Sequence, residues 1–205
     1  MMFVNGVLAV GGLLSAFGLS SAAGLNACLP LLAVGLLSRF HHLALAPSYA
    51  SLHSTPVLAV LAVLFVIDVV GDKIPGVDHV LHAVGVVAYP IAGAIAFASQ
   101  AGVVRHVPTP LALTIGLLTA GSLHTARAAI RPAATAATVG LANPVLSTVE
   151  DVMSGVLTLL ALAAPVLAAA LAVAIAIVTW RLLRRLRRAL RWLARPHQTV
   201  LPPTT

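Results

Sequence analysis

Charged side chains are scarce in this sequence. Asp, Glu, Lys and Arg together make up 8% of its 205 residues, and only five of them are acids. Soluble domains carry about a quarter charged residues. Hydrophobic residues account for 60% of the chain, and its mean hydropathy is +1.05. This composition excludes an ordinary soluble domain and indicates an integral membrane protein.

Cysteine is nearly absent, and no catalytic motif is evident. The single cysteine, Cys28, excludes an intrachain disulfide, and we expect it to pack as a small apolar residue. The sequence shows no convincing Ser/His/Asp order, nucleophile motif or glycine-rich phosphate loop. We therefore expect a protein that is not an enzyme and has no cofactor.

The apolar residues form several runs that predict membrane helices. At about 20 residues per span, the length suits about four to six segments in a single bundle. Residues 3–23 read as a retained first helix, because no positive n-region of a signal peptide precedes them. The expected fold is all-α: a polytopic membrane helix bundle over residues 1–180 with a basic tail over 181–205.

Many of these apolar runs are too short to cross a bilayer upright. Residues 57–70 and 111–123 are examples, and Gly, Pro or Asn interrupts the chain near residues 24–30. We expect a helix over 77–104 kinked at Pro90, broken structure over 124–144, and a long helical run over 145–180 that tilts, bends at Pro165 or extends into water. Open backbone at membrane depth lines a cavity or is buried in protein, which predicts broken or re-entrant helices. Short core helices tilted within the bundle are the alternative.

Basic residues concentrate at the C-terminus. Seven of the twelve lie between Arg181 and Arg195, in RLLRRLRRALRWLAR, with leucines at 183, 186, 190 and 193. This spacing predicts a basic amphipathic helix on the membrane surface, in contact with anionic lipid headgroups. The positive-inside rule then predicts a cytoplasmic C-terminus in a multi-pass protein of the plasma (cell inner) membrane. Membrane contact explains this charge better than nucleic acid, which we do not expect as a partner.

The five acids occupy two places in the chain. Asp68, Asp72 and Asp78 form one group, and Glu150 and Asp151 form the other. Asp68 and Asp72 are four residues apart and share a helix face, where their charges repel. A cation between them would relieve this repulsion, and Lys73, a proton or a metal ion could supply it.

The stretch GDKIPGVDHVLH has two interpretations. His79 and His82 are three residues apart on a helix and, beside Asp78, could chelate a divalent ion with Glu150 or Asp151 as a further ligand. Alternatively, the stretch is a solvated loop in which Pro75 and Gly76 form a turn and Asp78 caps the next helix.

The arginines outside the tail also have two interpretations. Arg127 and Arg131 share a helix face, and pairing with the buried acids would offset part of their desolvation cost. They could instead bind an anionic group of a substrate.

Several motifs resemble one known family. The segments GLNACLPLLAVGLLSRF, GDKIPGVDHV, YPIAGAIAFAS and HTARAAIRPAATAATVGLANPVLSTVEDV, within residues 15–175, are similar to the bacterial integral membrane family described as domain of unknown function 4126. Tyr89 departs from the pattern, since an arginine is expected before that proline, as at Arg131. The resemblance implies a membrane architecture and no specific activity. The motif positions are Asn26, Pro30, Asp72, Lys73, Pro75, Asp78, Pro132, Asn143, Pro144, Glu150 and Asp151.

These patterns predict a small secondary transporter or channel with an acidic site that handles protons or cations. The alternatives are a scaffold subunit of a larger membrane complex and a protein that handles divalent metal. A homo-oligomer or a partner membrane subunit fits either role. The candidate ion- or substrate-binding residues are Asn26, Asp68, Asp72, Lys73, Asp78, Arg127, Arg131, Asn143, Glu150 and Asp151, and the candidate metal ligands are His79 and His82.

Overall fold

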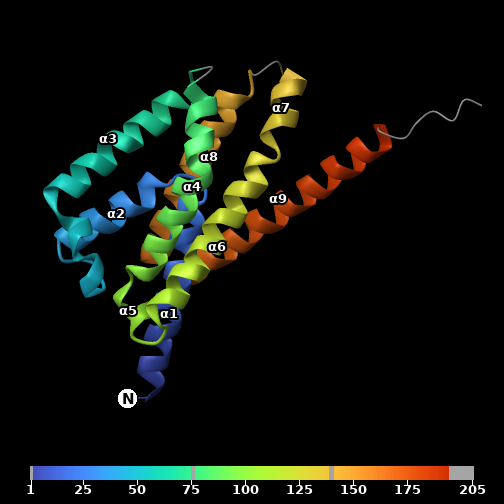
Figure 1. Cartoon of the computed structure of the whole chain (residues 1–205). Helices are drawn as coiled ribbons and strands as arrows, with labels where there is room; N and C mark the ends of the chain where they lie inside the picture. The colour runs from blue at the N-terminus through green and yellow to red at the C-terminus, as the bar shows by residue number, and fades with distance from the viewer. Residues whose placement is uncertain (1, 75–76, 139–140, 194–205) are drawn as a thin grey trace, which may run out of the picture.

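The protein is an all-α bundle. The computed structural model describes residues 2–74, 77–138 and 141–193, and within these ranges the only strand-like pairing is an isolated bridge between Leu45 and Gln100 (Figure 1). The predicted all-α class is confirmed. The elements are α1 (Met2–Ala23), α2 (Cys28–Arg39), the 3-10 helix η1 (Pro47–His53), α3 (Thr55–Gly71), α4 (Val77–Ala98), α5 (Ala101–Val104), α6 (Thr109–Ala128), α7 (Arg131–Thr138), α8 (Asn143–Ala163) and α9 (Pro165–Leu193).

Helix α1 forms the centre of the bundle. It packs against α4, α6, α8 and α9, and its bounds agree closely with the predicted first segment. Two buried serines tie it to its neighbours: Ser20 donates to the Gly116 carbonyl of α6 at 2.8 Å, and Ser154 of α8 donates to the Ala22 carbonyl at 2.9 Å. Small and hydroxylated residues let helices approach closely where water is excluded. The sequence composition of α1 therefore explains its central place.

The closest helix pair is α4 and α6. A Cβ added to Gly116 would collide with the Gly93 carbonyl oxygen and lie 2.7 Å from the Phe97 Cβ, and one added to Gly93 would collide with the Ala120 side chain. The two glycines thus allow the backbones to touch. This contact positions the later half of α4, which carries Tyr89, against the half of α6 that carries His124.

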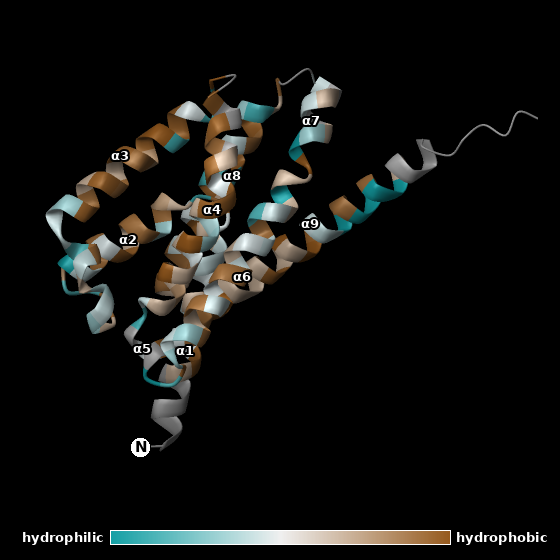
Figure 2. Ribbon diagram, viewed as in Figure 1, coloured by the Kyte–Doolittle hydropathy of each residue, from teal (hydrophilic) through white to brown (hydrophobic). Residues whose placement is uncertain are grey.

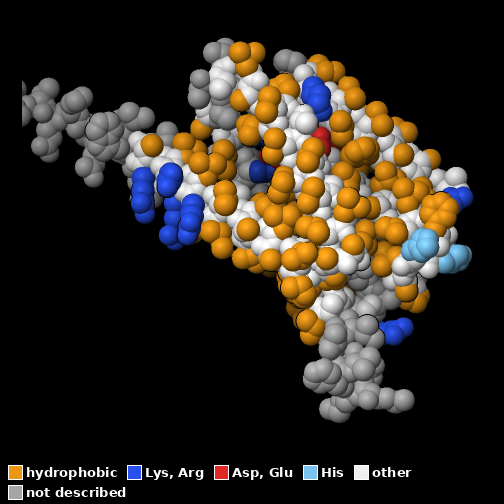
Figure 3. Space-filling view, turned by 180° about the vertical axis from the view of Figure 1, so that it is seen from behind, with side chains coloured by type: hydrophobic (Ala, Val, Ile, Leu, Met, Phe, Trp, Pro, Cys, Tyr) orange, Lys and Arg blue, Asp and Glu red, His pale blue; other side chains and the backbone are white. Residues whose placement is uncertain are grey.

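The outer surface is apolar. Two described helices, α8 and α9, are long and apolar enough to cross a membrane, and η1 with α3, bent by 65°, forms a third candidate as a broken span or re-entrant loop. Shorter apolar helices cover Ala9–Ala23, Cys28–Arg39 and Ala83–Ala98. Hydrophobic residues dominate the ribbon in Figure 2 and the visible surface in Figure 3. These features indicate a membrane protein.

Two expected helix boundaries in the middle of the chain differ from the structure. The helix expected over 77–104 ends at Ala98, because Gln100 adopts an extended conformation before α5. The region 124–144 is less broken than expected, since α6 continues through His124 to Ala128. The chain then restarts as α7 with Pro132 in the first turn, where a missing N–H costs no hydrogen bond.

The long run over 145–180 is two helices, not one. Ala164 separates α8 from α9 with φ −146° and ψ 73°. Proline disfavours helical geometry in the residue before it, so Pro165 ends α8 and starts α9. Helix α9 then continues without a break into the basic segment and extends away from the bundle (Figure 1). The predicted domain boundary at residue 180 lies inside this helix.

Candidate functional site

The charged residues meet where several helices begin or end. Asp72 is the C-cap of α3, Arg131 begins α7, and Ser147 lies in the second turn of α8. Ser147 donates to Asp72 Oδ2 at 2.8 Å, and Arg131 Nη2 lies 3.5 Å from the same oxygen. Asp72 and Arg131 are each about 6% exposed. The end of α3 is therefore attached to α7 and α8 by polar contacts.

Glu150 joins the two arginines. Its Oε2 accepts from Arg127 Nη1 at 2.7 Å and from Arg131 Nη2 at 2.6 Å. The Arg127 Nη1 group also donates to the Leu25 carbonyl at 2.6 Å, at the end of α1. Charge-assisted hydrogen bonds of this kind offset the desolvation of buried ions. Asp72 and Glu150 thus converge on Arg131, and the arginines do pair with acids.

Asn26 connects α2 to α8. Its Nδ2 donates to Asp151 Oδ1 at 2.9 Å, while its Oδ1 accepts from the backbone N–H groups of Cys28 and Leu29 at 3.1 and 3.0 Å. The Asn26 side chain therefore caps the first turn of α2 and at the same time orients the Asp151 carboxylate. Asn26 is fully buried, so few other conformations are available to it.

Asp68 faces an aromatic group. Tyr89 Oη donates to both carboxylate oxygens at 3.4 and 3.5 Å, which is long for an O–H donor. The Tyr89 ring stacks on His124, with centroids 4.4 Å apart, and lies 4.4 Å from the Arg127 guanidinium carbon. The Arg127 Nε also donates to His124 Nδ1 at 3.4 Å. This stack links Asp68 to the ion pairs.

The site has more acids than arginines. Arg127 and Arg131 contact Glu150 and Asp72, whereas the hydrogen-bond partners of Asp68 and Asp151 within the described ranges are the uncharged Tyr89 and Asn26. Asp68 lies within electrostatic range of Asp72 and Asp151, and also of Arg127.

Lys73 does not sit between Asp68 and Asp72 as suggested. Its ammonium group donates to the Val69 carbonyl at 2.6 Å and the residue is exposed, because the turn after Gly71 directs it outward. Arg131 is the cation at Asp72. Lys73 still contributes long-range attraction to Asp151.

Asn143 lies beside the site and not in it. Its Oδ1 accepts from Thr135 Oγ1 at 3.0 Å, which ties α7 to the start of α8. The side chains of Asp78, His79 and His82, and the turn at 75–76, lie outside the described residues, so the metal site stays a prediction there. In the part of the chain that is described, no group of three or more His, Cys, Asp or Glu residues could hold a metal ion. Glu150 contacts arginines instead.

A cavity of about 200 Å³ borders the ion pairs. Arg127, Arg131 and Glu150 line it from one side, and Met153, Ile175 and Leu182 from α8 and α9 line it from the other. Its walls are mainly apolar apart from these charged groups. The cavity shows that α9 leaves space next to the arginines.

Three residues of this site were not predicted. Tyr89 was singled out only as a departure from a family pattern, and His124 and Ser147 were not among the candidate site residues. His124 precedes Arg127 by three residues and Ser147 precedes Glu150 by three, so each shares a helix face with a predicted residue. This spacing is the signal that could have found them.

The fold and the site together define an all-α membrane protein with a buried ion-pair cluster. The chain matches the family described as "Domain of unknown function (DUF4126)" over residues 13–185 and belongs to that family. The comparisons with curated proteins and with solved structures gave no match.

Proposed function

We propose that this protein is a small secondary transporter or channel, not an enzyme, and that its acidic site exchanges protons or monovalent cations. The observation that supports this most is the excess of carboxylates. Among the described contacts, Asp68 and Asp151, both partly buried, bond to the uncharged Tyr89 and Asn26, whereas Asp72 and Glu150 contact arginines. A partly buried carboxylate whose hydrogen-bond partner is uncharged is costly in a low-dielectric environment, so a proton or cation at this place would be favoured.

The broken helices support the same function. The start of α2, the end of α3 and the start of α7 converge with α8 around these acids. Discontinuous helices leave unpaired backbone groups at a site, and many secondary transporters bind ions where such helices meet. At the other end of α3, the bend of 65° from η1 makes this pair a broken span or a re-entrant loop.

The two arginines hold the site together in this proposal. Arg127 reaches three elements at once, through the Leu25 carbonyl, Glu150 and the Tyr89 ring. Both guanidinium groups are largely buried against acids of this chain. They fix the position of α8 relative to α1 and α6, and Asp68 and Asp151 are left to exchange ions. Arginine binding to an anionic substrate is therefore the weaker interpretation.

Flux measurements test the proposal. Purified protein is reconstituted into liposomes that contain a pH-sensitive dye, and either a proton gradient or a potassium diffusion potential is applied. We expect flux above that of protein-free liposomes, and loss of it in Asp68→Asn and Asp151→Asn. Thr148→Ala is the matched control, because Thr148 is exposed on α8 and its hydroxyl donates to the Pro144 carbonyl of the same helix.

The same experiment distinguishes transport from a scaffold role. Large apolar residues are exposed along α3 and α4, including Val63, Ile67, Val84 and Val87, and such faces suit either lipid or the helices of a partner. Absence of flux, combined with a membrane subunit that co-purifies stoichiometrically, would contradict transport and support the scaffold. Flux that persists unchanged in both Asp variants would contradict the assignment of the site.

A further inference from the structure

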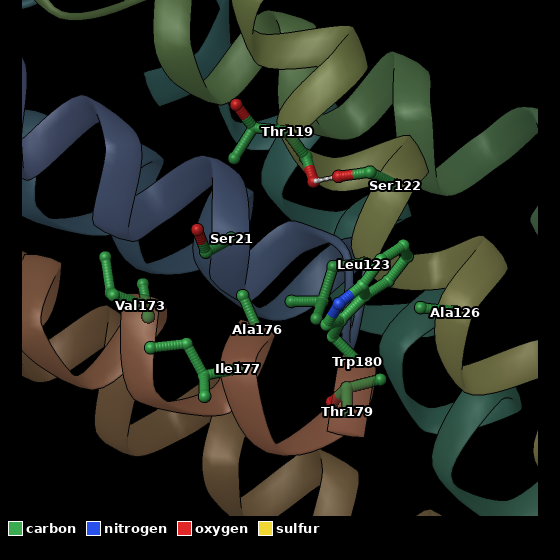
Figure 4. A pocket seen from close by; sticks show the side chains of 11 residues that line it. Ser21, Thr119, Ser122, Leu123, Ala126, Val173, Ala176, Ile177, Thr179 and Trp180 are labelled. Carbon is green, nitrogen blue, oxygen red and sulfur yellow. Dashed lines mark hydrogen bonds between the residues drawn. The ribbon is translucent and has the colours of Figure 1, made fainter. Parts of the chain in front are cut away.

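Helix α9 borders a second and larger cavity, which shares Thr179 with the first. This groove, of about 460 Å³, lies between α1, α6 and α9 (Figure 4), and none of the ion-pair residues lines it. Its size is within the range of small-molecule sites. Val173, Ala176 and Ile177 of α9 line it opposite Ser21 of α1 and Leu123 of α6.

The interior of the groove suits hydrocarbon. Of its hydroxyl groups, that of Thr119 donates to the Ile115 carbonyl at 2.8 Å and that of Ser122 donates to the Thr119 carbonyl at 3.0 Å. These hydroxyls are thus satisfied within α6, as the dashed line in Figure 4 shows for Ser122. Ser21 and Thr179 also line the groove, and its other walls are Ala, Val, Leu, Ile and Trp side chains. A polar ligand would find few hydrogen-bond partners inside.

Basic side chains lie just beyond one end of the groove. Trp180 lines that end, and the Arg184 guanidinium carbon lies 4.7 Å from the centroid of its ring. Arg181 follows Trp180 directly, and Figure 3 shows basic side chains gathered on the outer part of α9. Tryptophan and arginine at the end of an apolar helix mark the membrane–water interface. From Trp180 to Val173 the groove then extends about 10 Å toward the bilayer centre, at 1.5 Å per residue.

We propose that this groove binds one acyl chain of an anionic phospholipid, whose phosphate group contacts Arg181 and Arg184. An apolar channel that opens beside arginines at the interface matches both parts of such a lipid. A zwitterionic lipid of the same chain length carries the same hydrocarbon but gains less from the arginines. The site is distinct from the acidic cluster and does not depend on its role.

Quenching of Trp180 fluorescence tests this site. Trp192 is the other tryptophan of the chain, so the measurements use a Trp192→Phe background. The full-length protein is placed in phosphatidylcholine nanodiscs that contain a small fraction of brominated lipid, either phosphatidylglycerol or phosphatidylcholine. We expect brominated phosphatidylglycerol to quench Trp180 more strongly than brominated phosphatidylcholine does. It should reach the same quenching at a lower mole fraction. Equal quenching by the two lipids would overturn the proposal.

Two sets of variants locate the binding. Ala176→Phe fills the groove and should abolish the preference, whereas Ala174→Phe, an exposed alanine of the same helix outside the groove, should retain it. Arg181→Gln and Arg184→Gln should each weaken the preference about fivefold, as expected for one surface arginine near anionic lipid. An equal loss of preference in Ala176→Phe and Ala174→Phe, or no change in either arginine variant, would overturn the site.

Discussion

Arg131 and Glu150 form a 2.6 Å ion pair between the start of α7 and the second turn of α8. Through the same Nη2 group, Arg131 also approaches Asp72 at the end of α3. One guanidinium therefore connects three helix ends that are far apart along the chain. The stability of the bundle should depend on this connection.

Removal of Glu150 should destabilise the protein strongly. In Glu150→Ala, Arg127 and Arg131 lose the carboxylate that they share, and Asp72, 3.5 Å from Arg131, is the remaining acid in ion-pair contact among the described contacts. Breaking a buried pair in this way typically costs about 3–5 kcal/mol in the free energy of unfolding. Thermal unfolding of the purified protein in detergent measures this loss of stability. Val152→Ala, at an exposed position of α8, is the control. Equal unfolding midpoints for the two variants would contradict this role.

Arg127→Lys should not behave as a conservative change. A lysine retains the charge but lacks the planar fork of the guanidinium. It therefore cannot bond to the Leu25 carbonyl and Glu150 while also lying flat on the Tyr89 ring. We expect a loss of about 1–3 kcal/mol from the unsatisfied buried groups. Arg105→Lys, at an exposed position, is the matched control and should unfold like the wild type. A similar result for both lysine variants would argue against the contacts of Arg127.

Glycine at the α4–α6 contact should be required. Gly116→Val and Gly93→Leu place atoms where the structure has the backbone or side chain of the other helix, so the helices must separate. Overpacking of this kind costs about 1–3 kcal/mol or more. Gly155→Ala is the control, because its added Cβ meets only a Leu29 methyl group at 3.9 Å. The yield of folded protein and its unfolding midpoint distinguish the variants, and tolerance of both larger changes would contradict the contact.

Asn26→Asp should make stability depend on pH. The substitution replaces the donor to Asp151 with a second carboxylate, while the cap of α2 keeps its acceptor. The two carboxylates repel when both are ionised and share a proton when the pH falls. We therefore expect the deficit relative to the wild type to be large at neutral pH and smaller at mildly acidic pH. Asn26→Ala loses the cap without adding charge, so its deficit should change less, and identical pH profiles would contradict the explanation.

Local features of the sequence predicted the helices well. The first segment was expected over 3–23 and is observed over Met2–Ala23, because a long apolar run in lipid must satisfy its backbone hydrogen bonds within a helix. Pro165 was recognised as a point of bending, since proline acts on the residue before it. The end of α4 at Ala98 was missed because Ser99 bonds back to Ala96 and Ala46 bonds to the Ser99 carbonyl. Ala46, which donates the second bond, lies in a loop that is distant from Ser99 along the chain.

The candidate site was predicted in part. The acids were conspicuous because they are scarce, and ionised groups in an apolar chain need partners. Asp72, Arg131 and Glu150 do converge. The partners of Asp68 and Asp151 were not foreseen. Tyr89 is 21 residues from Asp68, and Asn26 is 125 residues from Asp151. Helix periodicity relates only residues on the same helix, and it carries no information on contacts at such separations.

Composition and periodicity by themselves determined that this chain forms apolar helices interrupted at Gly, Pro and Asn, because these preferences act within one or two helical turns. The tertiary structure alone decided which acid faces which arginine, that Lys73 points outward, and that α9 diverges to leave two cavities. Those outcomes depend on how whole helices pack against one another. A difference of one residue in the end of a helix rotates each following side chain by about 100°.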